Sequence, residues 1–136
     1  MNLLSELVEY LSSKTTLVPG DNLFYNTMYD TPDNAVCLQL SPLSYSTPSP
    51  INGEVTIVDV TVRNESNDVA YNIGKEIYRW LYTDKEDVED ADGLIKVSDA
   101  LTIATSMYGP PVWSRTDDKD RKYFTFKVKI FSRRII

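Results

Sequence analysis

The chain has 136 residues, of which 42% are hydrophobic and 25% are charged, and its formal net charge at pH 7 is -6. This length and composition predict a single globular domain over residues 1–136 and exclude a disordered or fibrous chain. The sequence contains no histidine, which removes the commonest general base and the commonest zinc ligand. We therefore expect a protein that is not an enzyme and that holds no metal or cofactor.

A first helix is expected from Asn2 to about Ser13. Leu3, Leu4, Leu7, Val8 and Leu11 recur at the spacing of one helical face. Acidic residues interrupt this apolar stretch, which is unlike a signal peptide, and no window approaches the roughly 18 apolar residues of a membrane span. The sequence thus predicts a soluble, unsecreted protein with no membrane partner.

Irregular chain, anchored by the apolar segment 23–25, is expected between this helix and a first strand at Ala35–Leu40. Cys37 lies inside that strand, where a buried structural thiol is the expected role. Residues 41–50 contain three prolines and four serines, a composition that favours extended backbone. We expect them to form a projecting loop, either a mobile connector or a segment ordered by a partner.

A central strand is expected at Glu54–Arg63, because Val58, Val60 and Val62 alternate with other side chains. The cap-type residues at 66–68 begin a second helix that extends to residue 82. Gly74 lies inside this helix at a cost of about 1 kcal/mol relative to alanine. We expect it to allow a strand to approach closely.

Two strands are expected in the last third of the chain. The first covers Ala100–Tyr108 and ends at Gly-Pro-Pro, and a polar turn over residues 114–121 leads to the second. In the second, the apolar side chains from Phe124 to Ile130 alternate with Thr125, Lys127 and Lys129, which places the lysines on a solvent face and suits an edge strand. The prediction is an α+β fold: an antiparallel or mixed sheet of about four strands, with two helices packed on one face.

Charge is distributed unevenly along the chain. Residues 115–136 contain eight basic and three acidic residues, a net charge of +5. The rest of the chain therefore carries a net charge of -11, which gives the total of -6. The strongest acidic run is DKEDVEDAD at 84–92, and with Gly93 it is expected to form an acidic loop over residues 84–93. Two opposite poles allow head-to-tail pairing between copies if they lie on different faces.

Three chemical motifs are weighed against simpler alternatives. Residues 88–99 match part of a calcium-loop register, but Val88 offers no side-chain oxygen at the first ligand position and Asp99 replaces the bidentate Glu at the twelfth, so a solvated acidic loop is favoured. Asp59 is interpreted as a polar residue on a half-exposed strand face. The basic, aromatic C-terminal strand resembles a nucleic-acid surface, but its rings and lysines alternate to opposite faces, which argues against specific binding.

Four ordered features carry a resemblance to a known family: the N-terminal MNLLSELVEYL, the Pro32–Asn34 segment before the first strand, the Arg63 corner with Ala70 in the following helix, and the basic strand YFTFKVKIFSRR. Together they resemble the minor capsid, tail terminator or tail completion proteins of long-tailed bacteriophages. The resemblance spans nearly the whole chain. It implies a structural virion part in the tail or neck, assembled in the host cytoplasm.

The resemblance implies that this chain forms a ring, usually a homohexamer in that family. The ring would stop the tail tube at its head-proximal end and join it to the head connector or stopper. Its partners would be identical subunits, the tube protein and the connector, with DNA passing through the lumen without specific binding. The alternative is a small acidic module that occupies a basic site on another protein. Interface residues expected from the loops and charged poles are Tyr45, Asp84, Glu86, Asp87, Glu89, Asp90, Lys127, Lys129, Arg133 and Arg134.

Overall fold

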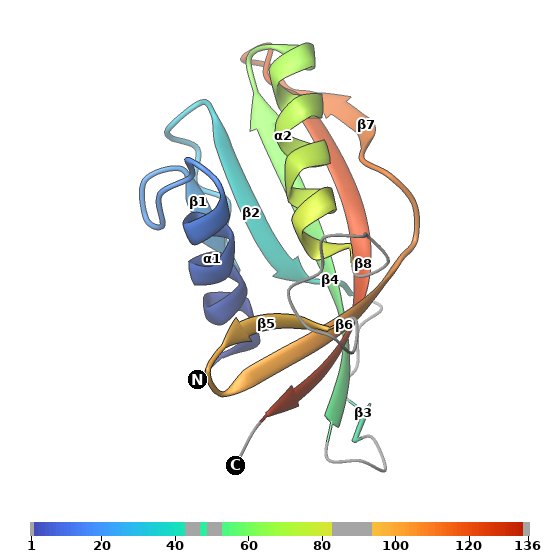
Figure 1. The fold of residues 1–136 in the computed structure, drawn as a ribbon. Helices are drawn as coiled ribbons and strands as arrows, with labels where there is room; N and C mark the ends of the chain where they lie inside the picture. The colour runs from blue at the N-terminus through green and yellow to red at the C-terminus, as the bar shows by residue number, and fades with distance from the viewer. Residues whose placement is uncertain (1, 43–46, 49–52, 83–93, 135–136) are drawn as a thin grey trace.

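The computed structural model describes residues 2–42, 47–48, 53–82 and 94–134. It contains two helices, α1 (Leu3–Lys14) and α2 (Asn67–Leu81), and one sheet (Figure 1). The strands are β1 (Leu23–Tyr25), β2 (Ala35–Leu40), β3 (Thr47–Pro48), β4 (Gly53–Asn64), β5 (Ile95–Ser98), β6 (Leu101–Met107), β7 (Val112–Thr116) and β8 (Lys122–Arg134).

The sheet runs in the order β1-β2-β4-β8-β6-β5, with β3 added to β4 and β7 added to β8. Only the β1–β2 pair is parallel within the described residues; the other pairs are antiparallel. The two longest strands, β4 and β8, pair from Gly53–Arg133 to Asn64–Lys122. The α+β class is therefore confirmed, whereas the prediction of about four strands is wrong.

The additional strands come from segments that carry little periodic signal. β1 is only three residues long, and β7 begins directly after Gly-Pro-Pro and occupies part of the predicted polar turn, which in the structure is confined to residues 117–121. All five residues of β7 are exposed, so no buried face marks it in the sequence. Thr47 and Pro48, inside the predicted projecting loop, pair with β4; residues 43–46 and 49–50 of that loop lie outside the described residues.

The C-terminal strand is not an edge strand. β8 pairs with β4 on one side and with β6 and β7 on the other. Its alternation is as predicted over the central part, where Phe126, Val128 and Ile130 are buried while Lys127 and Lys129 are half-exposed. The lysines thus belong to one face of a central strand.

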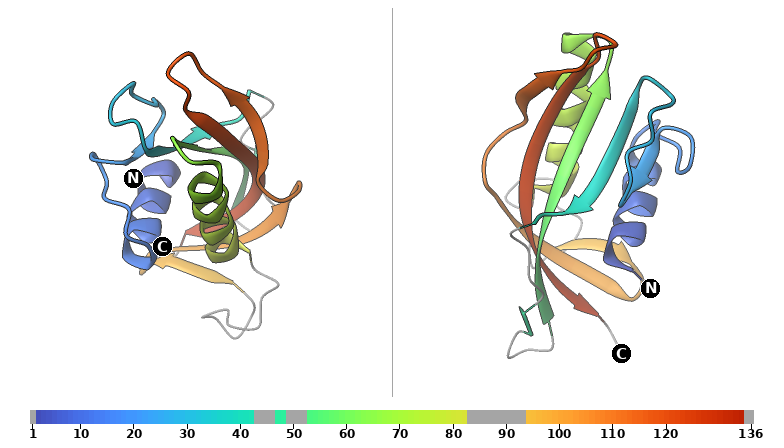
Figure 2. Two further views of the ribbon diagram at one scale, coloured as in Figure 1. Left: turned by 90° about the horizontal axis from the view of Figure 1, so that it is seen from above. Right: turned by 180° about the vertical axis from the view of Figure 1, so that it is seen from behind.

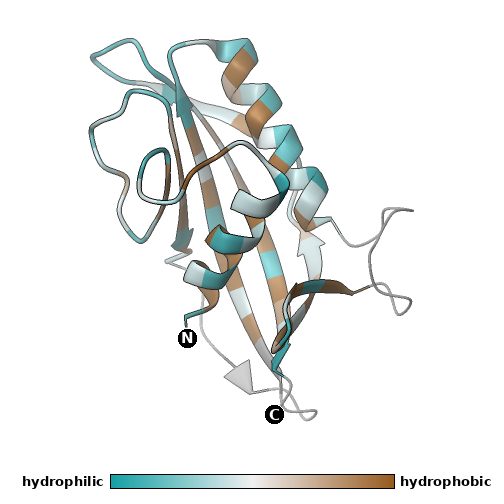
Figure 3. Cartoon of the chain, turned by 60° about the vertical axis from the view of Figure 1, so that its left-hand side comes forward, coloured by the Kyte–Doolittle hydropathy of each residue, from teal (hydrophilic) through white to brown (hydrophobic). Residues whose placement is uncertain are grey.

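Both helices pack on the concave face of the curled sheet, as expected (Figure 2). Asn2 caps α1 by accepting a hydrogen bond from the Leu4 amide at 2.7 Å, and Ser66 caps α2 through the Val69 amide at 3.4 Å. The apolar faces that follow these caps meet the hydrophobic residues of the sheet (Figure 3). The helical side chains buried in this core include Leu4, Leu7, Leu11, Ala70, Ile77 and Leu81.

Gly74 lies where α2 meets the segment between β6 and β7. A Cβ built on Gly74 would lie 3.2 Å from the Cβ of Pro111 and 3.8 Å from Cγ2 of Val62. A close approach at Gly74 is present, but the approaching chain is the Gly-Pro-Pro segment that leads into β7 and not a strand, as the sequence had suggested.

We predict that Gly74→Val lowers the free energy of unfolding by about 1–3 kcal/mol, because the branched side chain has no room beside Pro111 and forces the β6–β7 segment away from the helix. Asn72→Val, at an exposed position of the same helix, is the matched control for helix propensity. Chemical denaturation of both variants measures the difference. Equal stability of the two variants would contradict a packing role for Gly74.

Candidate interaction surface

The face of the sheet opposite the helices, here called the outer face, carries a register of polar side chains. Gln39, Asp59 and Lys127 lie side by side on β2, β4 and β8. Two residues away along each strand, on the same face, the next row consists of Cys37, Thr61 and Thr125. Neither of the two described helices covers this face.

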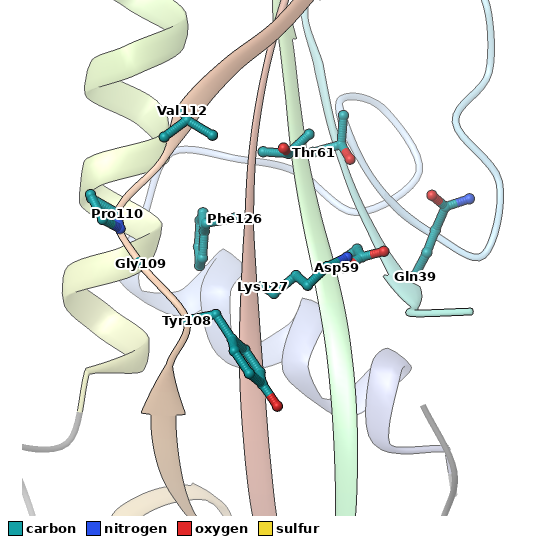
Figure 4. A pocket seen from close by; sticks show the side chains of 10 residues that line it. Gln39, Asp59, Thr61, Tyr108, Gly109, Pro110, Val112, Phe126 and Lys127 are labelled. Atoms are coloured by element: carbon teal, nitrogen blue, oxygen red, sulfur yellow. Dashed lines mark hydrogen bonds and ion pairs between the residues drawn. The ribbon is translucent and has the colours of Figure 1, made fainter. Parts of the chain in front are cut away.

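A groove runs along the outer face. It consists of two adjoining hollows of about 520 Å³ and 400 Å³ that share Gln39, Thr61 and Thr125 as their floor. Tyr108 and Val112, from the end of β6 and the start of β7, form one wall (Figure 4). The opposite wall is formed by the loop of residues 26–34.

Arg63 fastens this loop to the sheet. Its guanidinium is buried, and it donates hydrogen bonds to the carbonyl oxygens of Tyr29 and Pro32, both at 2.6 Å, and of Asp33 at 3.1 Å. A planar group with five donors can satisfy several carbonyls at fixed angles, which lysine cannot do. The loop backbone therefore has its hydrogen-bond partners although it forms no regular secondary structure.

Arg121 makes the second attachment, from the turn between β7 and β8. Its side chain is 4% exposed, and it binds the Asp117 carboxylate at 2.8 Å, the Asp30 carboxylate at 2.7 Å and the Asp30 carbonyl at 2.6 Å. Lys119 also pairs with Asp30. Asp117 in turn accepts from the Tyr123 hydroxyl at 3.0 Å and from the backbone amides of residues 119 and 121.

These contacts shift the ionisation of the carboxylates. Hydrogen bonds from Lys119 and then Arg121 lower the pKa of Asp30 to about 2. Burial acts to raise the pKa of Asp117, but the bonds from the Arg121 amide, the Tyr123 hydroxyl and the Arg121 guanidinium outweigh it and hold this pKa well below its ordinary value. Both groups remain charged at neutral pH and act as structural anions.

The structure divides the predicted basic contact residues into two sets. Lys127 pairs with Asp59 at 2.7 Å across the outer face, and Arg134 binds the buried Glu6 of α1 at 2.9 Å, so both have partners within the chain. Their role in contacts between copies stays a prediction. The Nζ of Lys129 lies 5.4 Å from the centroid of the Phe131 ring, and Arg133 is exposed near the end of β8.

The other predicted contact residues, Tyr45, Asp84, Glu86, Asp87, Glu89 and Asp90, lie outside the described residues, as does the acidic loop and most of the calcium-loop register. Within the described ranges, no group of three or more Cys, Asp or Glu side chains is arranged to hold a metal ion. Across the same ranges, neither helix has the length and hydropathy needed to cross a bilayer.

Two sets of surface residues were not predicted from the sequence. The loop anchors Arg63 and Arg121 reach loop residues that are 30 to 91 positions away in the chain, so spacing carries no signal for these contacts. Tyr108, Val112 and Trp113 are each more than half exposed around Gly-Pro-Pro. The signal that could have predicted these three was the presence of large apolar residues on both sides of a strand-breaking Gly-Pro-Pro sequence.

Comparison with known proteins adds no assignment: no protein family model matches the chain, and no curated protein matches it significantly.

We predict that Arg63→Met destabilises the fold by about 3 kcal/mol or more, because it removes three hydrogen bonds from a buried charged donor, each worth about 1.5–3 kcal/mol. Cys37, which is buried on the same face and whose pKa burial raises to about 11, provides a second readout. Its reaction with a thiol reagent under native conditions should accelerate as the loop opens. Arg133→Met, at an exposed position, is the control, and equal thiol reactivity of the two variants would contradict the role of Arg63 in fastening the loop.

We also predict a loss of stability in acid. The folded-state pKa values of Asp30 and Asp117 are lowered, so their contribution is complete above the unfolded value near 3.8 and is lost as the pH falls toward about 2. Denaturant unfolding at a series of pH values should show this fall, and Asp117→Asn should flatten it while lowering stability at neutral pH. Asp118→Asn, at the neighbouring exposed carboxylate, should keep the wild-type profile; an unchanged slope in Asp117→Asn would overturn the assignment.

Proposed function

We propose that the chain is a structural virion protein of a long-tailed bacteriophage, a tail terminator or tail completion protein. It forms a ring, expected to be a homohexamer, at the head-proximal end of the tail tube and joins the tail to the head connector. The observation that carries the proposal is that two of the features underlying the family resemblance are in direct contact: the Arg63 corner binds the carbonyl oxygens of Pro32 and Asp33 in the segment before β2.

The architecture supports a function by contact rather than by chemistry. One face of the sheet is filled by both helices, while the outer face is uncovered and grooved. The charged residues that the structure places together are ion pairs that stabilise the fold. Such a subunit works through its shape, and the long β4–β8 ribbon extends its reach away from the helices (Figure 1).

Within a ring, the half-exposed Lys129 and the exposed Arg133 in the second half of β8 are the charged contacts that this proposal assigns. Lys129 and Arg133 lie on the outward-facing positions of β8, in line with Lys127. They would face acidic residues of a neighbouring subunit, and the acidic remainder of the chain would line a channel through which DNA slides without adhering. The tail tube protein and the head connector would bind the two ends of the ring.

The proposal predicts the phenotype of a phage whose copy of this gene is disrupted. Heads and tails should accumulate separately, with tails of irregular length, because nothing ends the tube or presents a surface to the connector. Electron microscopy of lysates measures both effects. Supplying the wild-type chain in trans should restore joined particles, whereas the double variant Lys129→Glu, Arg133→Glu should restore few.

Complementation by Lys127→Met serves as the control, because Lys127 already has a partner inside the chain. Joined particles with tails of normal length in the disrupted phage would overturn the proposal. A purified chain that stays monomeric with tail tubes and binds a basic protein instead would support the acidic binding module.

A further inference from the structure

The second half of β8 presents two cations and an aromatic ring together on the outer face. Lys129, Phe131 and Arg133, here called the β8 patch, occupy alternate positions of the strand, so their side chains point to the same side of the sheet. Phe131 is 41% exposed, and the Nζ of Lys129 lies 5.4 Å from its ring centroid. The separation of rings and lysines onto opposite faces, expected from the sequence, therefore holds for Phe124 and Phe126 but not for Phe131.

The residues that flank the β8 patch on the neighbouring strands carry no charge. Neither Lys129 nor Arg133 makes an ion pair with the described residues. The flanking positions, taken from the registers of β6 and β4 against β8, are Thr102, Ala104, Ser106, Val55 and Ile57. Two cations on either side of an exposed ring, with no acid next to them, suit a partner that carries negative charges around an apolar group.

The acidic run DKEDVEDAD, residues 84–92, has the complementary pattern in its sequence. Its alternate residues are Asp84, Glu86, Val88, Asp90 and Asp92, which are four acids around one valine. In an extended conformation, alternate side chains point to one side at the same spacing as those of β8. An extended run laid along β8 thus places acids opposite the two cations and the valine opposite the ring.

The length of the run favours a neighbouring copy over the same chain as its source. Leu81 and Ile95, close to the two ends of the run, are both buried on the helix side of the sheet. If residues 84–92 lay extended along β8, only one residue at each end would remain to pass around the sheet edge. A residue spans at most about 3.6 Å, whereas β8 is two strands from the edge strand β5, a distance of about 10 Å.

We propose that the β8 patch of one copy of the chain binds the acidic run of the next copy, with Phe131 at the centre of the contact. A contact between two different surfaces is heterologous, and it propagates from copy to copy until it closes into a ring. This inference rests on the proposed function for the expectation of a ring. It adds the segment that supplies the acidic residues and the ring side chain that they surround.

Cross-linking of the purified full-length chain tests the contact. Ser106→Cys places a thiol next to Lys129 at an exposed position, and Ala91→Cys places one in the acidic run. The native Cys37 is buried and its pKa is raised to about 11, so it reacts slowly. With a short bis-maleimide, a mixture of the two variants should give a 91-to-106 cross-link between chains, and each variant alone should give little.

The charges are tested in the same mixture. Adding Arg133→Glu to the Ser106→Cys chain should lower the cross-link yield by about tenfold, because it replaces an attraction by a repulsion. Lys75→Glu makes the same change of charge at an exposed position of α2 and should leave the yield unchanged. Circular dichroism confirms that each variant is folded before the comparison.

A charge exchange and a change of the ring make the test specific. Lys129→Glu with Arg133→Glu should abolish the cross-link, and Glu86→Lys with Asp90→Lys in the other chain should restore it, whichever direction the run takes along β8. Phe131→Ser should lower the yield by about tenfold, as expected for an aromatic side chain at the centre of a contact. A high salt concentration should also lower it, since the Debye length at 1 M is about 3 Å.

No cross-link in the mixture at high protein concentration would overturn the inference, as would a yield that is insensitive to the charge exchange. A chain that carries both cysteines and cross-links internally, without joining a second chain, would assign the run to its own patch and overturn it too. Binding of a single-stranded oligonucleotide that depends on Phe131, without any cross-link, would assign the patch to nucleic acid instead.

The result is separate from the phage experiment because the assay uses the chain alone. A charge-dependent cross-link with normal tails in the disrupted phage would leave the contact standing and remove the proposed function. Unjoined heads and tails in the disrupted phage, without a cross-link between purified chains, would leave the proposed function standing and remove the contact.

Discussion

Two buried guanidinium groups hold an irregular loop against the outer face of the sheet, and the outer surface depends on this arrangement. A buried cation without partners would be strongly unfavourable. Arg63 is satisfied by three backbone carbonyls, and Arg121 by three carboxylates and a carbonyl. The loop at residues 26–34 has no strand partner of its own, so these two side chains tie it to the sheet. Removing their acceptors leaves buried cations unpaired.

The same loop serves two surfaces. On one side, Met28 and Asp30 border the groove on the outer face. On the other, Tyr29 closes the hollow beside β1 through its contact with Phe24. Since Arg121 belongs to the turn between β7 and β8, this contact also links the loop to the β7–β8 hairpin. The position of the loop relative to the hairpin is therefore set by side chains on the sheet and its turn.

Sequence periodicity predicted the elements that bury one face. α1, α2, β2, β4, β6 and β8 each place apolar residues at the spacing of their secondary structure, and each lies close to its expected bounds. β7 has no buried side, and β1 takes its position from parallel pairing with β2, so neither shows a pattern. The loop anchors could not be predicted for a different reason. An arginine at the end of a strand is expected to be exposed, and only the folded chain brings Arg63 next to carbonyl oxygens that are distant in the sequence.

The charge asymmetry of the sequence does not become an equal asymmetry of the surface. Arg121, Lys127 and Arg134 pair with Asp30, Asp59 and Glu6 from other parts of the chain, which offsets part of the apparent positive pole. Exposed ion pairs contribute about 0–1 kcal/mol each to stability. In a contact between copies, exposed cations such as Arg133 would therefore align the partners more than hold them.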